Sequence, residues 1–134
     1  MRKINNKKKS VLIIGFGSIG EKHAMILKKF FNFHNIFILT KRKTRKYFTI
    51  RKLNDIKKFD FDYIVISSNT SKHLTHIKYI EKNFNNKKIL VEKPLFNKFQ
   101  KIKIKKNKVF VGYNLRFHPL IQYLKKNLEK SKIF

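Results

Sequence analysis

The stretch Ser10-Val-Leu-Ile-Ile-Gly15-Phe-Gly17-Ser-Ile-Gly20 decides the fold of this chain. Its first five residues form an apolar, β-branched run, which is typical of a strand buried in a parallel sheet. A G-x-G-x-x-G pattern follows directly and opens a segment with helical spacing of apolar residues, 18–31. In this setting the first glycine permits a tight turn, the second lets backbone approach a pyrophosphate, and the third lets helix and strand pack closely. The pattern predicts a dinucleotide-binding turn; a glycine-rich turn without a ligand is the alternative.

Strands and helices alternate along the rest of the chain. We expect further strands at Asn35–Thr40, Tyr47–Ile50, Tyr63–Ser67, Lys88–Val91 and Lys108–Gly112. We expect further helices from Thr70 or Ser71, as the cap, to about Phe84, and from Pro119 to about Lys130. Lys98–Lys108 is expected to be a loop or a frayed helix. This alternation predicts a single α/β domain, a doubly wound Rossmann-type parallel sheet with helices on both sides.

The helical segments carry apolar residues at the spacing of one helix face. In the first helix these residues are Ile19, Ile26, Leu27 and Phe30. In the second they are Leu74, Ile77, Ile80 and Phe84, and in the last they are Leu120, Leu124 and Leu128.

The composition is strongly basic, with 34 Lys+Arg against 7 Asp+Glu and a formal net charge of +27. Such a charge usually indicates a nucleic acid or an anionic surface as partner. Lys, Ile, Phe and Asn, which have A/T-rich codons, make up 74 of the 134 residues, so a biased genome would give the same charge without such a partner. We therefore expect non-specific, salt-sensitive binding of nucleic acid.

Several classes of protein are excluded by what the sequence lacks. The absence of cysteine excludes a disulfide scaffold, a thiolate metal site and a cysteine nucleophile. No apolar run approaches the roughly 18 residues of a membrane span, and Val11–Ile14 is too short for a signal peptide. We therefore expect a soluble, cytoplasmic protein that does not act at a membrane.

Three further segments follow predicted strands and are candidates for a site. Thr40-Lys41-Arg42 lies about 20 residues beyond the glycines, where an NAD-specific site usually has a carboxylate and where Arg accommodates a 2′-phosphate. Because no acidic residue occurs between Glu21 and Asp55, we expect NADP(H) to be preferred, with NAD(H) possible.

The second segment, Ser67-Ser68-Asn69-Thr70, is placed either at the ligand crevice or in a helix cap and turn. His73 and His76 lie three residues apart without an accompanying Cys or carboxylate, so no metal site is expected. In the third segment, Glu92-Lys93-Pro94, a lysine beside a carboxylate is suited to donate a proton.

Four motifs together resemble the N-terminal half of the Gfo/Idh/MocA family of NAD(P)-dependent oxidoreductases. They are G-F-G-S-I-G at 15–20, I-V-I-S-S-N-T-S-K-H at 64–73, V-E-K-P-L at 91–95 and V-G-Y-N-L-R-F-H-P at 111–119. The E-K-P element and the run Asn114–Pro119 are the specific ones, since the glycine motif is shared by many families. The resemblance covers the chain from about residue 10 onward.

The resemblance implies a role for each matching residue. Gly15, Phe16, Gly17, Ser18, Ile19 and Gly20 would wrap the pyrophosphate, and Thr40, Lys41 and Arg42 would meet the adenosine ribose. Ser67, Ser68, Asn69 and His73 would line the crevice between adenine and nicotinamide. Glu92 and Lys93 would lie at the nicotinamide, with Lys93 as the catalytic lysine, and Asn114 and Arg116 would lie near the nicotinamide and the substrate. Family substrates are typically sugars, sugar nucleotides, inositols or related polyols.

Length is where the chain departs from the family, whose members are usually more than twice as long. Residues 1–118 correspond to the NAD(P)-binding domain, and 119–134 to a helix that would lead to a missing substrate domain. We expect either a fragment with little activity alone, which is favoured, or a cofactor domain completed by a partner chain. A substrate would then be bound only if a substrate domain is supplied, and an uncovered apolar surface would favour self-association. A non-catalytic cofactor-binding module and a basic nucleic-acid-binding protein are the alternatives.

Overall fold

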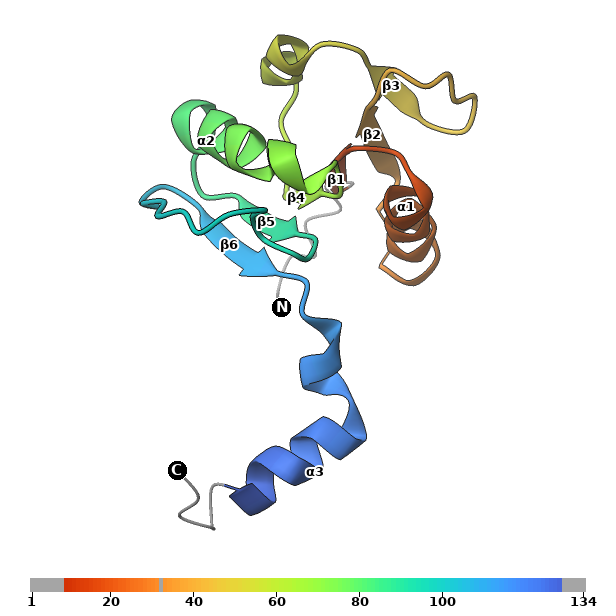
Figure 1. The fold of residues 1–134 in the computed structure, drawn as a ribbon. Helices are drawn as coiled ribbons and strands as arrows, with labels where there is room; N and C mark the ends of the chain where they lie inside the picture. Colours follow the sequence, from red (N-terminus) through yellow and green to blue (C-terminus); the bar gives the residue numbers. More distant parts are fainter. Residues whose placement is uncertain (1–8, 32, 129–134) are drawn as a thin grey trace, which may run out of the picture.

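The computed structural model describes residues 9–31 and 33–128 of the chain (Figure 1). Its strands are β1 (Ser10–Ile14), β2 (Asn35–Leu39), β3 (Phe48–Ile50), β4 (Tyr63–Ile66), β5 (Lys88–Val91) and β6 (Lys108–Val111). Its α-helices are α1 (Ser18–Phe30), α2 (His73–Asn83) and α3 (Pro119–Leu128), and its 3-10 helices are η1 (Leu53–Lys58), η2 (Thr70–Lys72) and η3 (Asn114–Phe117). All six predicted strands are confirmed, each within one residue of its predicted ends. The predicted end of the last helix, at about residue 130, lies outside the described residues.

The six strands form one parallel sheet in the order β3-β2-β1-β4-β5-β6. The chain runs outward from β1 to β3, then returns to pair β4 with the other side of β1. The order therefore reverses between β1 and β4, and in a doubly wound sheet the crevice at this switch point, beyond the carboxyl ends of the strands, is where ligands bind. The predicted Rossmann-type fold is confirmed.

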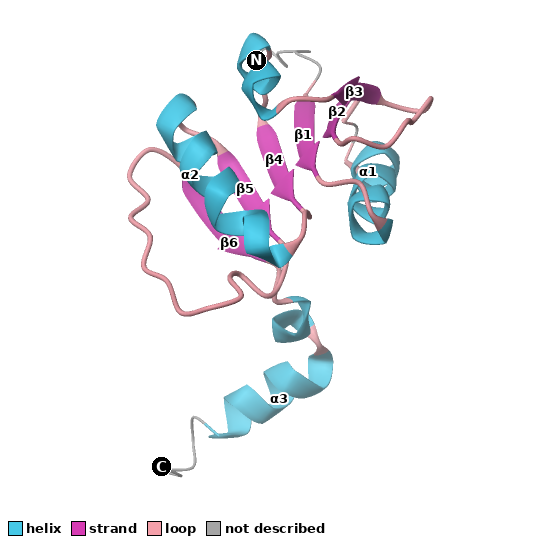
Figure 2. Cartoon of the chain, turned by 45° about the horizontal axis from the view of Figure 1, so that its top comes forward, coloured by secondary structure: helices cyan, strands magenta, loops and turns pink. Residues whose placement is uncertain are grey.

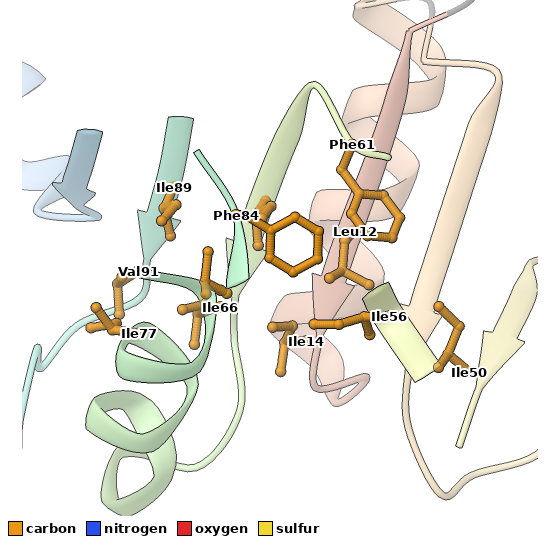
Figure 3. Packing of buried hydrophobic residues seen from close by; sticks show 12 residues of the cluster. Leu12, Ile14, Ile50, Ile56, Phe61, Ile66, Ile77, Phe84, Ile89 and Val91 are labelled. Carbon is orange, nitrogen blue, oxygen red and sulfur yellow. The ribbon is translucent and has the colours of Figure 1, made fainter. Parts of the chain in front are cut away.

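Two apolar clusters cover the two faces of the sheet, because alternate residues of a strand point to opposite faces. Leu12 and Ile14 of β1 belong to the larger cluster, with Ile77 and Ile80 of α2 and Ile56 of η1 (Figure 3). The other face of β1 packs against α1, through a smaller cluster that includes Val11, Ile13, Ala24 and Leu27. The helices α1 and α2 thus lie on opposite faces of the sheet, as Figure 2 also shows.

The apolar stripe expected in the first helix is corrected by the structure. Of its four residues only Leu27 is buried, whereas Ile19, Ile26 and Phe30 are 44%, 40% and 66% exposed. The face of α1 that meets the sheet carries Gly20, Ala24 and Leu27 instead. The small residues Gly20 and Ala24 let the helix approach the strands closely. A search for large apolar residues at helical spacing misses a face of this kind.

The start of α2 also differs from the prediction. Residues 70–72 form the 3-10 turn η2, and the α-helix begins at His73 with Lys72 as its N-cap. Neither Thr70 nor Ser71 makes the expected capping hydrogen bond. The predicted stripe is largely confirmed, since Ile77, Ile80 and Phe84 are buried.

The last helix, α3, extends away from the sheet beyond β6 (Figure 1). Its ten residues are all exposed, including Leu120, Leu124 and Leu128 on the predicted face. Among the described residues, no helix has the length and apolar character needed to cross a membrane.

Candidate functional site

The glycine turn joins β1 to α1 at the carboxyl edge of the sheet, and its three glycines have different surroundings. Gly15 has a φ of +95°, and a Cβ there would lie 2.6 Å from the Ser68 backbone. A Cβ on Gly20 would lie 2.2 Å from the carbonyl oxygen of Gly15. A Cβ on Gly17 would meet no atom within 4 Å. The first and third glycines therefore allow close packing, while the second leaves an open backbone surface.

Ser67, at the end of β4, fixes this turn from the neighbouring strand. Its hydroxyl donates a hydrogen bond of 2.9 Å to the carbonyl oxygen of Gly15. The backbone N–H of Gly15 donates to the carbonyl oxygen of Leu39 on the other side. The turn is thus held between β4 and β2, the two neighbours of β1.

Both histidines at the start of α2 contact Ser68. The Nε2 atom of His73 lies 2.8 Å from the carbonyl oxygen of Ser68, and Nδ1 of His76 lies 2.9 Å from the Ser68 hydroxyl. His73 is 1% exposed. Burial, with smaller contributions from the charges of His73 and Lys72, lowers the pKa of His76 from 6.5 to about 4, so His76 is neutral at pH 7. The two histidines, three residues apart on the helix, therefore hold one residue between them, His73 through the backbone of Ser68 and His76 through its hydroxyl.

Ser68 separates two hollows along the carboxyl edge. We call the first the β2-side hollow; its volume is about 320 Å³. Its lining residues are Ile14, Gly15, Leu39, Thr40, Lys41, Arg51, Leu53, Ser68, Asn69, Lys72 and His76. Three of these side chains are cationic and none is a carboxylate.

Two arginines fix the chain after β2. Arg51, directly after β3, donates from Nη1 to the carbonyl oxygens of Thr40 (3.3 Å) and Arg42 (2.8 Å). Arg42 donates from Nη1 to the carbonyl oxygen of Phe16 in the glycine turn, at 3.2 Å. Arg51 thus lines the hollow, while the guanidinium of Arg42 faces the glycine turn. Sequence reasoning singled out Arg42 and missed Arg51.

The second hollow, which we call the β5-side hollow, lies between α1 and the end of β5 and has a volume of about 380 Å³. Its lining residues are Ile19, Lys22, His23, Ile26, Ser67, Ser68, His73, Glu92, Lys93 and Asn114. Glu92 and Lys93 of the E-K-P element therefore meet Asn114 here, and Lys93 is exposed.

A short hydrogen bond crosses the β5-side hollow. The Nε2 atom of His23 on α1 lies 2.6 Å from Oε1 of Glu92, and both side chains are about one-fifth exposed, at 22% and 23%. On its other side the Glu92 carboxylate lies against Gly112, where an added Cβ would be 3.4 Å from Oε1. Sequence reasoning missed His23, because its contact with Glu92 depends on how α1 packs against the sheet.

The remaining predicted residues lie beside the hollows without lining either. Phe16, Gly17 and Ser18 form the glycine turn between them, and Phe16 packs edge-to-face on Tyr47. Arg116 lies on η3, where its Nε donates to the carbonyl oxygen of Tyr113 and its guanidinium stacks over the Tyr113 ring. The structure thus brings the other predicted residues together and leaves Arg116 apart.

Solved structures with the same fold are dehydrogenases of greater length. The WlbA dehydrogenase from Chromobacterium violaceum, solved with NADH and UDP-GlcNAcA, has a TM-score of 0.76 at 17% identity, covering 93% of this chain and 41% of that chain. Scyllo-inositol dehydrogenase from Lactobacillus casei has a TM-score of 0.76 at 19% identity, covering 95% of this chain and 44% of that chain. Myo-inositol 2-dehydrogenase from Lactobacillus plantarum has a TM-score of 0.71 at 20% identity, covering 92% of this chain and 42% of that chain. At these identities the similarity concerns the fold, and the chain spans less than half the length of each.

The family itself follows from the sequence. No curated protein sequence matches the chain. Residues 9–113, which include β1 to β6 and both hollows apart from Asn114, match the family model described as an oxidoreductase family with an NAD-binding Rossmann fold. The chain therefore belongs to the Gfo/Idh/MocA oxidoreductase family, through its NAD-binding Rossmann-fold domain.

Proposed function

We propose that this chain binds a nicotinamide dinucleotide along the carboxyl edge of its sheet, with NADP(H) preferred over NAD(H). In the complete catalytic unit it would transfer a hydride between the nicotinamide and a carbinol carbon of a sugar or polyol. The observation that carries the proposal is the pair of hollows that meet at Ser68, with the glycine turn between them. A dinucleotide has two ends joined by a pyrophosphate, and this arrangement matches that shape.

The open side of the glycine turn suits the pyrophosphate. Gly17 is the N-cap of α1 and has no side chain, so the first N–H groups of the helix receive no side-chain cap. These N–H groups and the positive end of the helix dipole attract phosphate. The open surface at Gly17 leaves room for the phosphate oxygens to approach.

The charge of the β2-side hollow supports the preference for NADP(H). Lys41, Arg51 and Lys72 line it, and its lining includes no carboxylate that would accept a hydrogen bond from a ribose 2′-hydroxyl. A 2′-phosphate adds negative charge at that place, which three cations attract. Thr40 and Asn69 add polar groups for the ribose and the base.

The β5-side hollow is the proposed place for the nicotinamide and the reacting carbon. The bound nicotinamide would accept or supply the hydride. The Lys93 ammonium would then give a proton to the substrate oxygen during reduction, or its amine would take one during oxidation. Glu92, held by His23, would orient the strand end that carries this lysine.

Substrate binding needs residues beyond those described, and the length comparison supports a further domain or a partner chain as their source. The class of substrate is proposed from the family and from relatives whose structures include UDP-GlcNAcA or scyllo-inositol. A non-catalytic cofactor-binding module is the second candidate. Self-association through an uncovered apolar surface and a cytoplasmic location remain predictions.

The test is a titration with NADPH, NADH and ATP at about 0.15 M and 0.5 M salt, followed by nicotinamide fluorescence and by heat. ATP is included because a chain of net charge +27 attracts any polyphosphate, and salt screens that attraction. We expect NADPH to bind most tightly and to keep its lead at the higher salt. Equal binding of all three ligands, abolished by salt, would contradict a formed cofactor site.

Catalysis is tested separately, because binding alone also fits the non-catalytic module. A panel of sugars, inositols and sugar nucleotides is assayed with the longest form of the protein that contains this domain. We expect Lys93→Met to abolish turnover while the affinity for NADPH changes by less than about threefold. Binding without turnover of any substrate by the unaltered protein would favour the module.

A further inference from the structure

A second concave surface lies on the outer side of α2, away from both cofactor hollows. The long loop between β5 and β6 runs beside this helix (Figure 2), and the two enclose a hollow of about 420 Å³. We call it the lysine trough; its lining residues are Lys78, Glu81, Lys82, Lys101, Ile102, Lys103, Lys105 and Lys106. It shares no residue with the β2-side or β5-side hollow.

The lysines of the trough form two rows. Lys78 and Lys82 are four residues apart on α2 and therefore lie on the same side of the helix. The opposite row comes from the extended segment 101–105, in which exposed lysines alternate with half-buried isoleucines. Ile102 and Ile104 pack against the larger core cluster, so the lysines between them are turned outward.

One carboxylate holds the two rows together. Oε1 of Glu81 on α2 accepts hydrogen bonds of 2.7 Å from the backbone N–H groups of Lys105 and Lys106. Oε2 of Glu81 accepts a hydrogen bond from Asn107, which is 9% exposed and also donates to the carbonyl oxygen of Phe84. The loop is thus attached to α2 at a fixed place.

Glu81 serves this attachment and does not neutralise the trough. Burial raises its pKa, but the hydrogen bonds from Asn107, Lys105 and Lys106, with the charge of Lys106, outweigh burial and lower the pKa below its usual value. The ion pairs formed within residues 9–31 and 33–128 use none of the six ammonium groups of the trough. Six exposed lysines therefore line one concavity whose two sides are joined by Glu81.

We propose that the lysine trough binds a flexible chain of phosphates, supplied by single-stranded nucleic acid or by inorganic polyphosphate. A small concave surface admits one chain, whereas a duplex presents its phosphates on a convex and rigid surface. Phe99, two residues before Lys101, is 91% exposed and would let a base stack beside the trough if the chain is a nucleic acid.

Charge-matched variants separate this site from general attraction to a basic protein. The trough variant carries Lys101→Gln, Lys103→Gln and Lys105→Gln. The control carries Lys43→Gln, Arg45→Gln and Lys46→Gln in an exposed loop and loses the same three charges. Binding of a labelled single-stranded RNA of about 12 nucleotides is followed by fluorescence anisotropy against salt.

We expect the trough variant to bind about 10-fold more weakly at about 0.15 M salt, and the control less than about threefold. The slope of log K against log salt should fall by about 2 in the trough variant, since each phosphate contact on a single strand contributes about 0.7. Equal losses in the two variants would overturn the proposal, because bulk charge would then explain the binding.

Glu81→Ala tests the same site with the opposite sign of charge. The change raises the net charge by one, so general attraction would tighten RNA binding. The trough predicts binding at least about threefold weaker, because the lysine segment loses its attachment to α2. Tighter binding by a variant with unaltered circular dichroism would contradict the role of the trough.

Three further arms identify the ligand and its place. We expect inorganic polyphosphate to compete with the RNA, and an RNA duplex of the same length to bind more weakly. If the natural ligand is a nucleic acid, Phe99→Ala should weaken the binding of RNA and leave the binding of polyphosphate unchanged. If the natural ligand is polyphosphate, the variant should bind both ligands as the unaltered protein does. Saturating NADPH should leave RNA affinity unchanged; displacement of the RNA, or tighter binding of the duplex, would overturn the proposal.

Discussion

The hydroxyl of Ser68 and Nδ1 of His76 lie 2.9 Å apart, so a hydrogen bond ties the end of β4 to the first full turn of α2. Burial is the main reason that the pKa of His76 falls from 6.5 to about 4, with smaller contributions from the charges of His73 and Lys72. The folded state therefore favours the neutral ring more strongly than the unfolded chain does.

The first prediction concerns stability at acid pH. Because the pKa of His76 is lower in the folded state, its stabilising contribution is complete above about pH 6.5 and is lost as the pH falls toward 4. A change from 6.5 to about 4 corresponds to about 3 kcal/mol as an upper value. His76→Gln should flatten the fall in the free energy of unfolding over this window, measured by urea denaturation. Carboxylates titrate in the variant and in the unaltered protein alike, so their effect cancels when the two pH profiles are compared. Identical pH profiles of the two proteins would contradict the lowered pKa of His76.

The second prediction separates the roles of two glycines. Gly20→Ala should destabilise the fold by about 2 kcal/mol or more, because its Cβ would lie 2.2 Å from the carbonyl oxygen of Gly15. Gly17→Ala should change stability by less than about 1 kcal/mol, since its Cβ meets no atom. It should nevertheless weaken NADPH binding about 10-fold by occupying the space meant for the phosphates. Denaturation and fluorescence titration measure the two effects, and a Gly17→Ala protein with normal NADPH affinity would contradict the proposed pyrophosphate site.

The third prediction concerns Arg51 and the choice of cofactor. Arg51 uses Nη1 on two backbone carbonyl groups, and a guanidinium has three further N–H groups on its other nitrogens. Arg51→Gln should weaken NADPH about 10-fold and NADH less than about threefold, with 2′,5′-ADP and 5′-AMP as competitors that show the same difference. Arg45→Gln, in an exposed loop, is the matched control. An equal loss for both cofactors would mean that Arg51 only supports the loop.

The fourth prediction concerns the hydrogen bond between His23 and Glu92. Both side chains are mostly buried, so removing either one leaves the other without this partner. His23→Ala should lower the free energy of unfolding by about 1–2 kcal/mol. A double-mutant cycle with Glu92→Ala should give a coupling energy of about 1 kcal/mol, measured by urea denaturation near neutral pH. A coupling near zero would show that the 2.6 Å contact does not stabilise the fold.

The strands were predictable because each is a short run rich in β-branched and aromatic residues, and the central strands β1 and β4 are buried on both faces. The glycine turn was predictable because its pattern stands between such a run and a helix. The orientation of α1 was not, since Gly20 has no side chain and the larger apolar residues Ile19, Ile26 and Phe30 suggested a different face from the one that carries Ala24. The 3-10 helix η1 was also missed, because Ile56 is its single buried residue.

The site was predictable where a strand end supplied the residue and not where the tertiary fold did. Thr40, Ser68 and Lys93 each follow a strand, so their place at one edge of the sheet follows from the fold class. Arg51 also directly follows a predicted strand, β3, so the same reasoning would have placed it at this edge, although sequence analysis singled out Arg42 instead. His23 reaches Glu92 only because α1 packs closely against the sheet.

The close packing of Gly15 and Gly20 has a consequence for binding. The bend between β1 and α1 is held by Ser67, by Leu39 and by the contact between the two glycines themselves, all of them protein groups. Its conformational entropy is therefore lost when the chain folds and need not be lost again when a ligand arrives. In the proposed cofactor complex the turn would act as a preorganised receptor, whose affinity for phosphate would reflect the fold's own rigidity.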